Sequence, residues 1–317
     1  MSYLYDWLQN YGLVIIVFNV IFKLLLMPLS FKSQKSMAKQ RFLQDDINEI
    51  KRVYANDPQR ASEAQMELMR ANGVSMGGGC LPSLFSILLL FGIWPPIQRP
   101  LHYIGRVGAE QIEQIGQFMF EKQMIGENVL KSLPRTDVSL LASLKENGEA
   151  LSTAVKEGWL ELKQVLDLNF LGMDLGKTPS FLPAKLFGEE SGTYLPLLLL
   201  VVILIVTMLI SLRLNKINMP SGMTKEERER ENRNPAKKGQ TPDQSEGMMK
   251  SMQIFMPIMM LFSAFTLPAA MTIFWISSNL LAILQTWLTY KLYTEPMQAA
   301  LDERYEKKLA GRRRKNK

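Results

Sequence analysis

The residue with the clearest chemical potential is a lysine inside an apolar stretch. Gly12–Ser30 reads GLVIIVFNVIFKLLLMPLS and contains Lys23. Asn19 stands four residues earlier, so both side chains share one face of a helix. As a helix the stretch crosses most of a ~30 Å hydrocarbon core. A cation at its centre costs roughly 2.5–3.5 kcal/mol, whereas each Leu, Ile, Val or Phe returns roughly 0.3–0.6 kcal/mol, so we expect insertion.

Lys23 has two interpretations. In the first, Lys23 and Asn19 line a wet cavity that opens to the cytosol, where the charge stays hydrated. In the second, the long lysine stem carries the ammonium to the nearby interface by snorkelling. Under the first interpretation, further polar residues of the spans belong to the same groove: Ser83, Ser86, Thr207, Ser263, Ser278 and Gln285. Their alternative role is interhelical hydrogen bonding, worth about 0.6 kcal/mol each.

The sequence carries no enzyme signature. A P-loop, a nucleophile elbow, a zinc motif and a dinucleotide fingerprint are all missing, and the chain has one histidine and one cysteine. A Ser-His-Asp triad, a histidine-based metal site and an intramolecular disulfide framework are therefore not expected. We expect neither an enzyme nor a cofactor.

Composition predicts a multi-span membrane protein. The 317 residues are 47% hydrophobic with a net charge of +7, and long apolar runs alternate with charged segments. Five runs stand out: Gly12–Leu29, Leu81–Ile97, Tyr194–Leu212, Gln253–Leu267 and Ala269–Tyr290. Lys and Arg concentrate after the first, third and fifth runs, so the positive-inside rule predicts the N-terminus outside and the C-terminus inside. The first run is expected to be a retained span, because no basic n-region or cleavage site precedes it.

We expect an all-α fold with five transmembrane helices, a cytosolic helical hairpin and an extra extracytosolic helical segment. The predicted boundaries are 1–30 (outer end and first span), 31–75 (hairpin), 76–97 (second span), 98–193 (extracytosolic insertion), 194–212 (third span), 213–252 (charged loop), 253–292 (hairpin of spans four and five) and 293–317 (basic tail).

The hairpin and the tail are candidate contact surfaces. We expect the hairpin to capture apolar partners through Met37, Lys39, Arg41, Lys51 and Arg52, although it also fits a solvated connector. The tail ends in GRRRKNK, a run that fits lipid head groups or ribosomal RNA. Six methionines between Met248 and Met260 suit either packing or a pliable apolar surface.

Four stretches together resemble one family, the YidC/Oxa/Alb membrane protein insertases, in their short Gram-positive-like form. The first is FKLLLMPLSFKSQKSMAKQRFLQ, with its base ahead of an M-x-P-L-like run. The second is GGGCLP (Gly77–Pro82), and the third is FLGMDLG (Phe170–Gly176). The fourth is MKSMQIFMPIMMLFSAFTLPAAMTIFWISSNLLAILQTWL. They fall in order on the expected spans.

The chain also departs from the family pattern. Ser86-Ile87-Leu88 stands where many members have Gln-x-Pro, and the intramembrane base is lysine rather than arginine, without the bidentate fork. Gln98–Asn169 is longer than the family leads us to expect, and the lipoprotein signal and the large periplasmic domain of other members are not found.

The resemblance implies an insertase and chaperone in the bacterial cell membrane that works without nucleotide hydrolysis. Its expected partners are nascent membrane proteins and the lipid bilayer, with the ribosome and the Sec translocon as further candidates. Two other hypotheses remain open. One is a small-molecule transporter or channel with Lys23 as an anion site, which the lack of a visible inverted repeat disfavours. The other is a scaffold subunit with an inactive groove.

Overall fold

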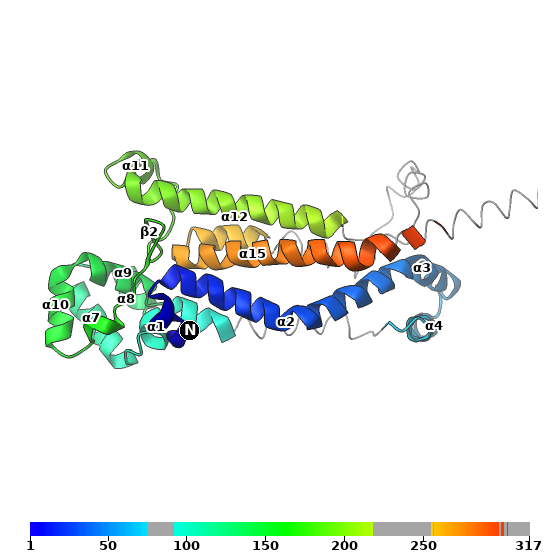
Figure 1. Cartoon of the computed structure of the whole chain (residues 1–317), viewed down its shortest axis with the longest axis horizontal. Coiled ribbons are helices and arrows are strands. Elements are labelled where there is room, and N and C mark those ends of the chain that lie inside the picture. Colours follow the sequence, from blue (N-terminus) through cyan, green and yellow to red (C-terminus); the bar gives the residue numbers. More distant parts are fainter. Residues whose placement is uncertain (75–91, 218–254, 256, 298, 301–302, 304–317) are drawn as a thin grey trace, which may run out of the picture. The chain divides into compact units, whose positions relative to one another are not determined.

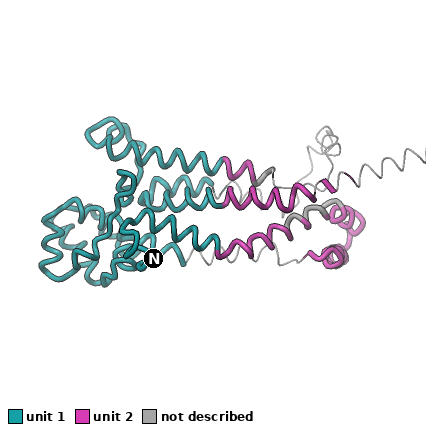
Figure 2. Tube along the Cα trace, viewed as in Figure 1, with its two compact units in different colours: residues 1–24, 87–209, 252–281 teal, residues 25–86, 210–251, 282–317 magenta. Residues whose placement is uncertain are grey.

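The computed structural model describes residues 1–74, 92–217, 255, 257–297, 299–300 and 303. Contacts divide the chain into two compact units (Figure 2). Unit 1 comprises residues 1–24, 87–209 and 252–281, and unit 2 comprises residues 25–86, 210–251 and 282–317. The described part is mostly helical (Figure 1).

Three of the described helices are long and apolar enough to cross a membrane: Tyr11–Ser36, Ser191–Leu214 and Ala269–Met297. They correspond to α2 (Tyr11–Phe42), α12 (Ser191–Ile217) and α15 (Ala269–Thr289), the last continued by η4 (Tyr290–Thr294). The predicted second span lies mainly outside the described residues. Of the fourth, residues 257–264 are helical, and a turn leads to Pro268, the residue before α15. Pro268 cannot continue a helix because it lacks an amide hydrogen, which explains the sharp break.

In unit 1, α15 contacts both other long helices. Asn19 of α2 and Thr207 of α12 each form a hydrogen bond to it. Leucines and isoleucines of α12 that do not contact protein are exposed, for example Leu199 at 59%. In a membrane such residues face lipid, so their exposure is expected.

Small helices form a compact cap within unit 1, and α1 (Ser2–Leu8) precedes α2. The cap comprises α6 (Pro100–Tyr103), α7 (Ala109–Glu121), α8 (Glu127–Ser132), α9 (Val138–Glu146), α10 (Gly148–Lys156) and η2 (Leu162–Gln164). Its core includes Ile112, Ile115 and Met119 of α7 and Leu140, Leu141 and Leu144 of α9, all at most 1% exposed. Asn147 separates α9 from α10; its side chain accepts a hydrogen bond from the Ala150 N–H at 3.3 Å and so caps α10.

The described part is mostly helical, as expected, and also contains one short pair of strands. Residues 169–174 form a short antiparallel pair, β1 (Asn169–Phe170) with β2 (Met173–Asp174), in the register Asn169 to Asp174. The turn between them places Leu171 and Gly172 at φ values of 53° and 81°. Two successive left-handed residues are the geometry of a tight hairpin, and glycine adopts it without a Cβ clash.

Between α12 and the strands lies α11 (Pro183–Phe187), which belongs to unit 1. In unit 2, α3 (Gln44–Val53) packs on α4 (Pro58–Ala71) through Ile47, Met69 and Val74. The Asp57 carboxylate accepts from the Arg60 N–H at 3.1 Å, and Pro58 occupies the first helical position, so the start of α4 is fixed locally.

Candidate functional site

Asn19 is the best-anchored polar residue of the candidate groove. Its side chain is 2% exposed. The amide nitrogen donates to Ser277 Oγ at 2.6 Å, to Ser278 Oγ at 2.8 Å and to the Phe274 carbonyl at 3.3 Å. Lipid offers no acceptor to a buried amide, so these partners on α15 are what allows asparagine within a span. The bonds therefore tie α2 to α15.

Lys23 lies one turn beyond Asn19 on α2 and is half-buried. Among the residues that the structure describes, none forms an ion pair or hydrogen bond with its ammonium. A lysine without a protein acceptor inside a span must reach water or lipid head groups to keep its charge. Its environment therefore differs from that of Asn19, which has all its donor capacity used within the protein.

A second polar contact joins α12 to α15. Asn279 Nδ2 donates to Thr207 Oγ1 at 3.5 Å, and Thr207 Oγ1 donates to the Leu204 carbonyl at 2.9 Å. Thr207 is 6% exposed. The two contacts place three predicted groove residues, Asn19, Thr207 and Ser278, on helices linked by polar bonds.

Ser277 and Asn279 were missed as individual site residues. Successive helical residues are about 100° apart, so Ser277 and Asn279 flank Ser278 around α15. One side of the run Ser277–Asn279 contacts α2, and the other side contacts α12. The signal in the sequence was the run of three small polar residues itself.

Two other predicted groove residues, Ser263 and Gln285, are described by the structure, and the hydrogen bonds given for them lie within their own helices. Ser263 Oγ donates to the carbonyls of Met259 and Met260 on its own helical segment, at 2.8 and 3.0 Å. Gln285 lies in the part of α15 that belongs to unit 2, where its backbone carbonyl accepts from Thr289 Oγ1 at 2.9 Å. Ser83 and Ser86 lie outside the described residues.

The predicted capture residues lie in unit 2. Lys39 is on α2, and Lys51 and Arg52 form the last turn of α3, where positive charge complements the helix dipole. Arg52 is exposed. Met37 and Arg41 belong to α2, but the structure does not describe their side chains. In the described ranges, no cluster of His, Cys, Asp or Glu could hold a metal ion.

The chain matches a protein family over almost its whole length. The model of the family described as "60Kd inner membrane protein" matches residues 3–296. The membrane protein insertase YidC of Oleidesulfovibrio alaskensis is 24% identical over 287 residues, which cover 90% of this chain and 36% of that protein. The family resemblance is therefore confirmed.

Shorter matches are stronger in identity. YidC of Syntrophus aciditrophicus is 38% identical over 94 residues, covering 30% of this chain and 17% of that protein. YidC of Fusobacterium nucleatum is 36% identical over 109 residues, covering 30% of this chain and 53% of that protein. This chain spans about a third or less of the length of the first two of these relatives. With its apolar helices and its family match, the chain belongs to the YidC/Oxa/Alb family of 60 kDa inner membrane proteins and is a multi-pass membrane protein.

Proposed function

We propose that this chain is a membrane protein insertase and chaperone. The observation that carries the proposal is Lys23, which lies on a span of a YidC-family chain. Its ammonium has no partner among the described residues, whereas the amide nitrogen of Asn19, one turn away, donates to two serines. A cation there attracts acidic residues of a client and keeps its surroundings hydrated. A hydrophilic client terminus or short loop can thus contact a hydrated, positively charged site within the membrane.

The driving force in this proposal is hydrophobic transfer of the client. Moving an apolar client segment from water into lipid yields about 25 cal/mol per Å² buried, so no nucleotide hydrolysis is required. The client would leave along α12 and α15. Within unit 1, the exposed apolar side chains Leu199 and Val202 on α12, together with Leu280 on α15, suit that path because they offer lipid-like contact.

Orientation and capture complete the proposal. The distribution of Lys and Arg supports five spans with the N-terminus outside. It thus assigns α3 and α4 to the cytosol, where Lys51 and Arg52 would meet clients first. The cap (α6 to α10) is then extracytosolic. The basic tail contacts lipid head groups or the ribosome, and the Sec translocon is a further candidate partner.

Substitution of Lys23 tests this proposal. In a strain depleted of its own insertase, Lys23→Arg should support insertion of a client with an acidic translocated terminus, whereas Lys23→Ala and Lys23→Glu should reduce it. Protease accessibility of the client terminus measures insertion. The matched control is Lys122→Ala, which removes an exposed lysine from the cap. Full insertion by all Lys23 variants would reject the role of this lysine.

The rival function is a transporter or channel in which Lys23 binds a small anion. Proteoliposomes that contain the purified chain and no client distinguish the two. Anion flux that depends on Lys23 would favour the channel, and its absence together with Lys23-dependent insertion would favour the insertase.

A further inference from the structure

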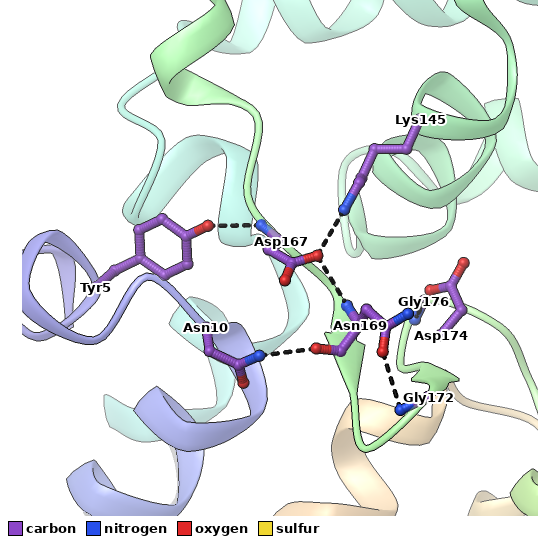
Figure 3. A network of polar contacts seen from close by, with 8 residues as sticks. All are labelled: Tyr5, Asn10, Lys145, Asp167, Asn169, Gly172, Asp174 and Gly176. Carbon is purple, nitrogen blue, oxygen red and sulfur yellow. Dashed lines mark hydrogen bonds and ion pairs between the residues drawn. The ribbon is translucent and has the colours of Figure 1, made fainter.

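Residues Asp167–Lys177, here called the strap, contain the motif FLGMDLG, for which the proposed function has no role. The strap holds the β1–β2 hairpin, and Asn169 Oδ1 accepts from the Gly172 N–H at 3.0 Å to close its turn (Figure 3). Leu168 and Leu175 are at most 1% exposed. The strap is thus an element with its own hydrogen bonds and two buried leucines, although Leu171 at its turn is 82% exposed.

Strap carbonyls cap the beginnings of two spans. The first N–H groups of a helix have no partner within the helix and need acceptors elsewhere. At α2, the Tyr11 N–H donates to the Asp167 carbonyl at 3.0 Å, and Asn10 Nδ2 donates to the Asn169 carbonyl at 2.7 Å. These contacts bind the strap to the start of the span that carries Lys23.

The same strap also caps α15. The Ala269 N–H donates to the Lys177 carbonyl at 2.9 Å, and the Ala270 N–H donates to the Leu175 carbonyl at 3.0 Å. Asn19 joins the same two helices, α2 and α15, further along α2. The strap therefore fixes the N-terminal ends of two helices that also contact each other through Asn19.

Close packing reinforces these bonds. A Cβ added to Gly12 of α2 would lie 2.6 Å from the Phe170 ring, so glycine is what lets the aromatic side chain rest on this helix. On the other side of the strap, a Cβ on Gly176 would lie 2.5 Å from the Ala142 side chain of α9. The strap therefore lies between the spans and the cap with little free space.

Two ion pairs and a further hydrogen bond also attach the strap to its neighbours. Lys145 Nζ lies 2.8 Å from Asp167 Oδ1, and Lys177 Nζ lies 2.6 Å from Glu146 Oε1. The Asp167 N–H donates to the Tyr5 hydroxyl of α1 (Figure 3). Burial raises the pKa of Asp167, but the hydrogen bond from Lys145, the hydrogen bond from the Asn169 N–H and the charge of Lys145 together leave that pKa below its ordinary value.

We propose that the strap is the seal of the groove, a positioning element that holds the N-terminal ends of α2 and α15 together and closes the client path at that end. The proposal rests on the proposed function, which supplies the groove. The charge distribution assigns these helix ends to the outside, so the strap would close the groove on that side. Closure itself is a physical property that can be measured without any client.

The test measures access to a buried position one turn below the strap. Ile15 on α2 is 1% exposed and lies three residues beyond Gly12. In a Cys80→Ser background, Ile15→Cys is labelled with a membrane-impermeant maleimide added from outside to intact cells. With the native strap we expect slow labelling. Tyr3→Cys, at an 83% exposed position, should be labelled rapidly in every variant.

Gly12→Leu places a side chain where the Phe170 ring lies, and it should raise the labelling rate of Ile15→Cys about tenfold, the ratio that corresponds to about 1.4 kcal/mol. Adding Phe170→Ala makes room for the leucine and should restore protection. The matched control is Gly192→Leu in the first turn of α12, where a Cβ meets nothing within 4 Å and labelling should not change. Ala269→Pro is the second variant, since proline is tolerated in a first helical turn but cannot donate to the Lys177 carbonyl.

Protection that persists in Gly12→Leu and in Ala269→Pro would overturn the proposal, as would a Gly12→Leu effect that Phe170→Ala fails to reverse. If the Gly12→Leu protein does not accumulate, the labelling rate of Ile15→Cys in Ala269→Pro alone tests the proposal. Lys23→Ala should leave Ile15→Cys protected. Consequently a negative labelling result rejects the strap while leaving insertion by Lys23 intact, and a negative insertion result leaves the seal intact.

Discussion

Asn19→Ala should weaken the association of α2 with α15 by an amount that the structure allows us to work out. The substitution removes the two short hydrogen bonds to Ser277 at 2.6 Å and to Ser278 at 2.8 Å, and with them the longer contact to the Phe274 carbonyl at 3.3 Å; the amide nitrogen has two hydrogens, so we count two bonds. Hydrogen bonds between membrane helices average about 0.6 kcal/mol, so the free energy of unfolding should fall by about 1.2 kcal/mol, or about eightfold in the equilibrium constant. Ser277 keeps its bond to the Phe274 carbonyl at 2.9 Å, which limits the loss.

A double-mutant cycle isolates the bond from the effect of the smaller side chain. Unfolding of the purified chain in bicelles would be measured for Asn19→Ala, Ser278→Ala and the double variant. We expect a coupling free energy of about 0.6 kcal/mol between the two positions. Coupling indistinguishable from zero would show that the bond adds nothing to the pairing of α2 with α15, and would refute the reasoning.

Three more predictions concern other parts of the fold. Burial raises the pKa of Asp137 to about 7, although the N–H groups of Leu101 and His102 oppose the shift. The native protein therefore holds this proton between about pH 4 and 7, where the unfolded chain has lost it, and the cap should lose stability as pH rises through that window. The thermal unfolding temperature should fall with pH over this range, and Asp137→Asn should abolish the dependence. Gly116→Ala puts a Cβ 2.3 Å from a Leu133 methyl and should cost about 1–3 kcal/mol, whereas Gly148→Ala enters open space and should cost less, as denaturant unfolding would reveal. Asp57→Ala removes the cap of α4 and should cost about 0.5–2 kcal/mol, seen as faster hydrogen exchange over residues 58–71. The Asp137 prediction fails if Asp137→Asn leaves the pH dependence unchanged, and the glycine prediction fails if both alanine variants cost the same. Unchanged exchange in Asp57→Ala would contradict the third.

Local sequence rules account for much of the described fold. Apolar length predicts the three described spans, and Asp57 followed by Pro58 predicts the start of α4. The i, i+4 spacing also placed Asn19 and Lys23 on one face. These features depend on residues close together in sequence, where helical periodicity and capping determine the outcome.

Contacts between distant residues could not be predicted in the same way. The partners of Asn19 are more than 250 positions away on α15, and the backbone N–H of Leu101 finds its acceptor in Asp137. The strap strands are two residues long, too short for a β pattern to be recognised, and their role becomes visible only through the helix ends that they cap. Periodicity carries no information about such pairings.

The most direct test of the central claim is site-specific photo-crosslinking from position 23 to a nascent membrane protein. A photoreactive residue replaces Lys23 in one chain and Ile21 in a control, because Ile21 is 48% exposed and lies about 200° away around α2. The insertase account predicts crosslinks to the client from position 23 during synthesis and far fewer from position 21. Crosslinks to lipid alone from position 23, or equal client crosslinks from both positions, would contradict it.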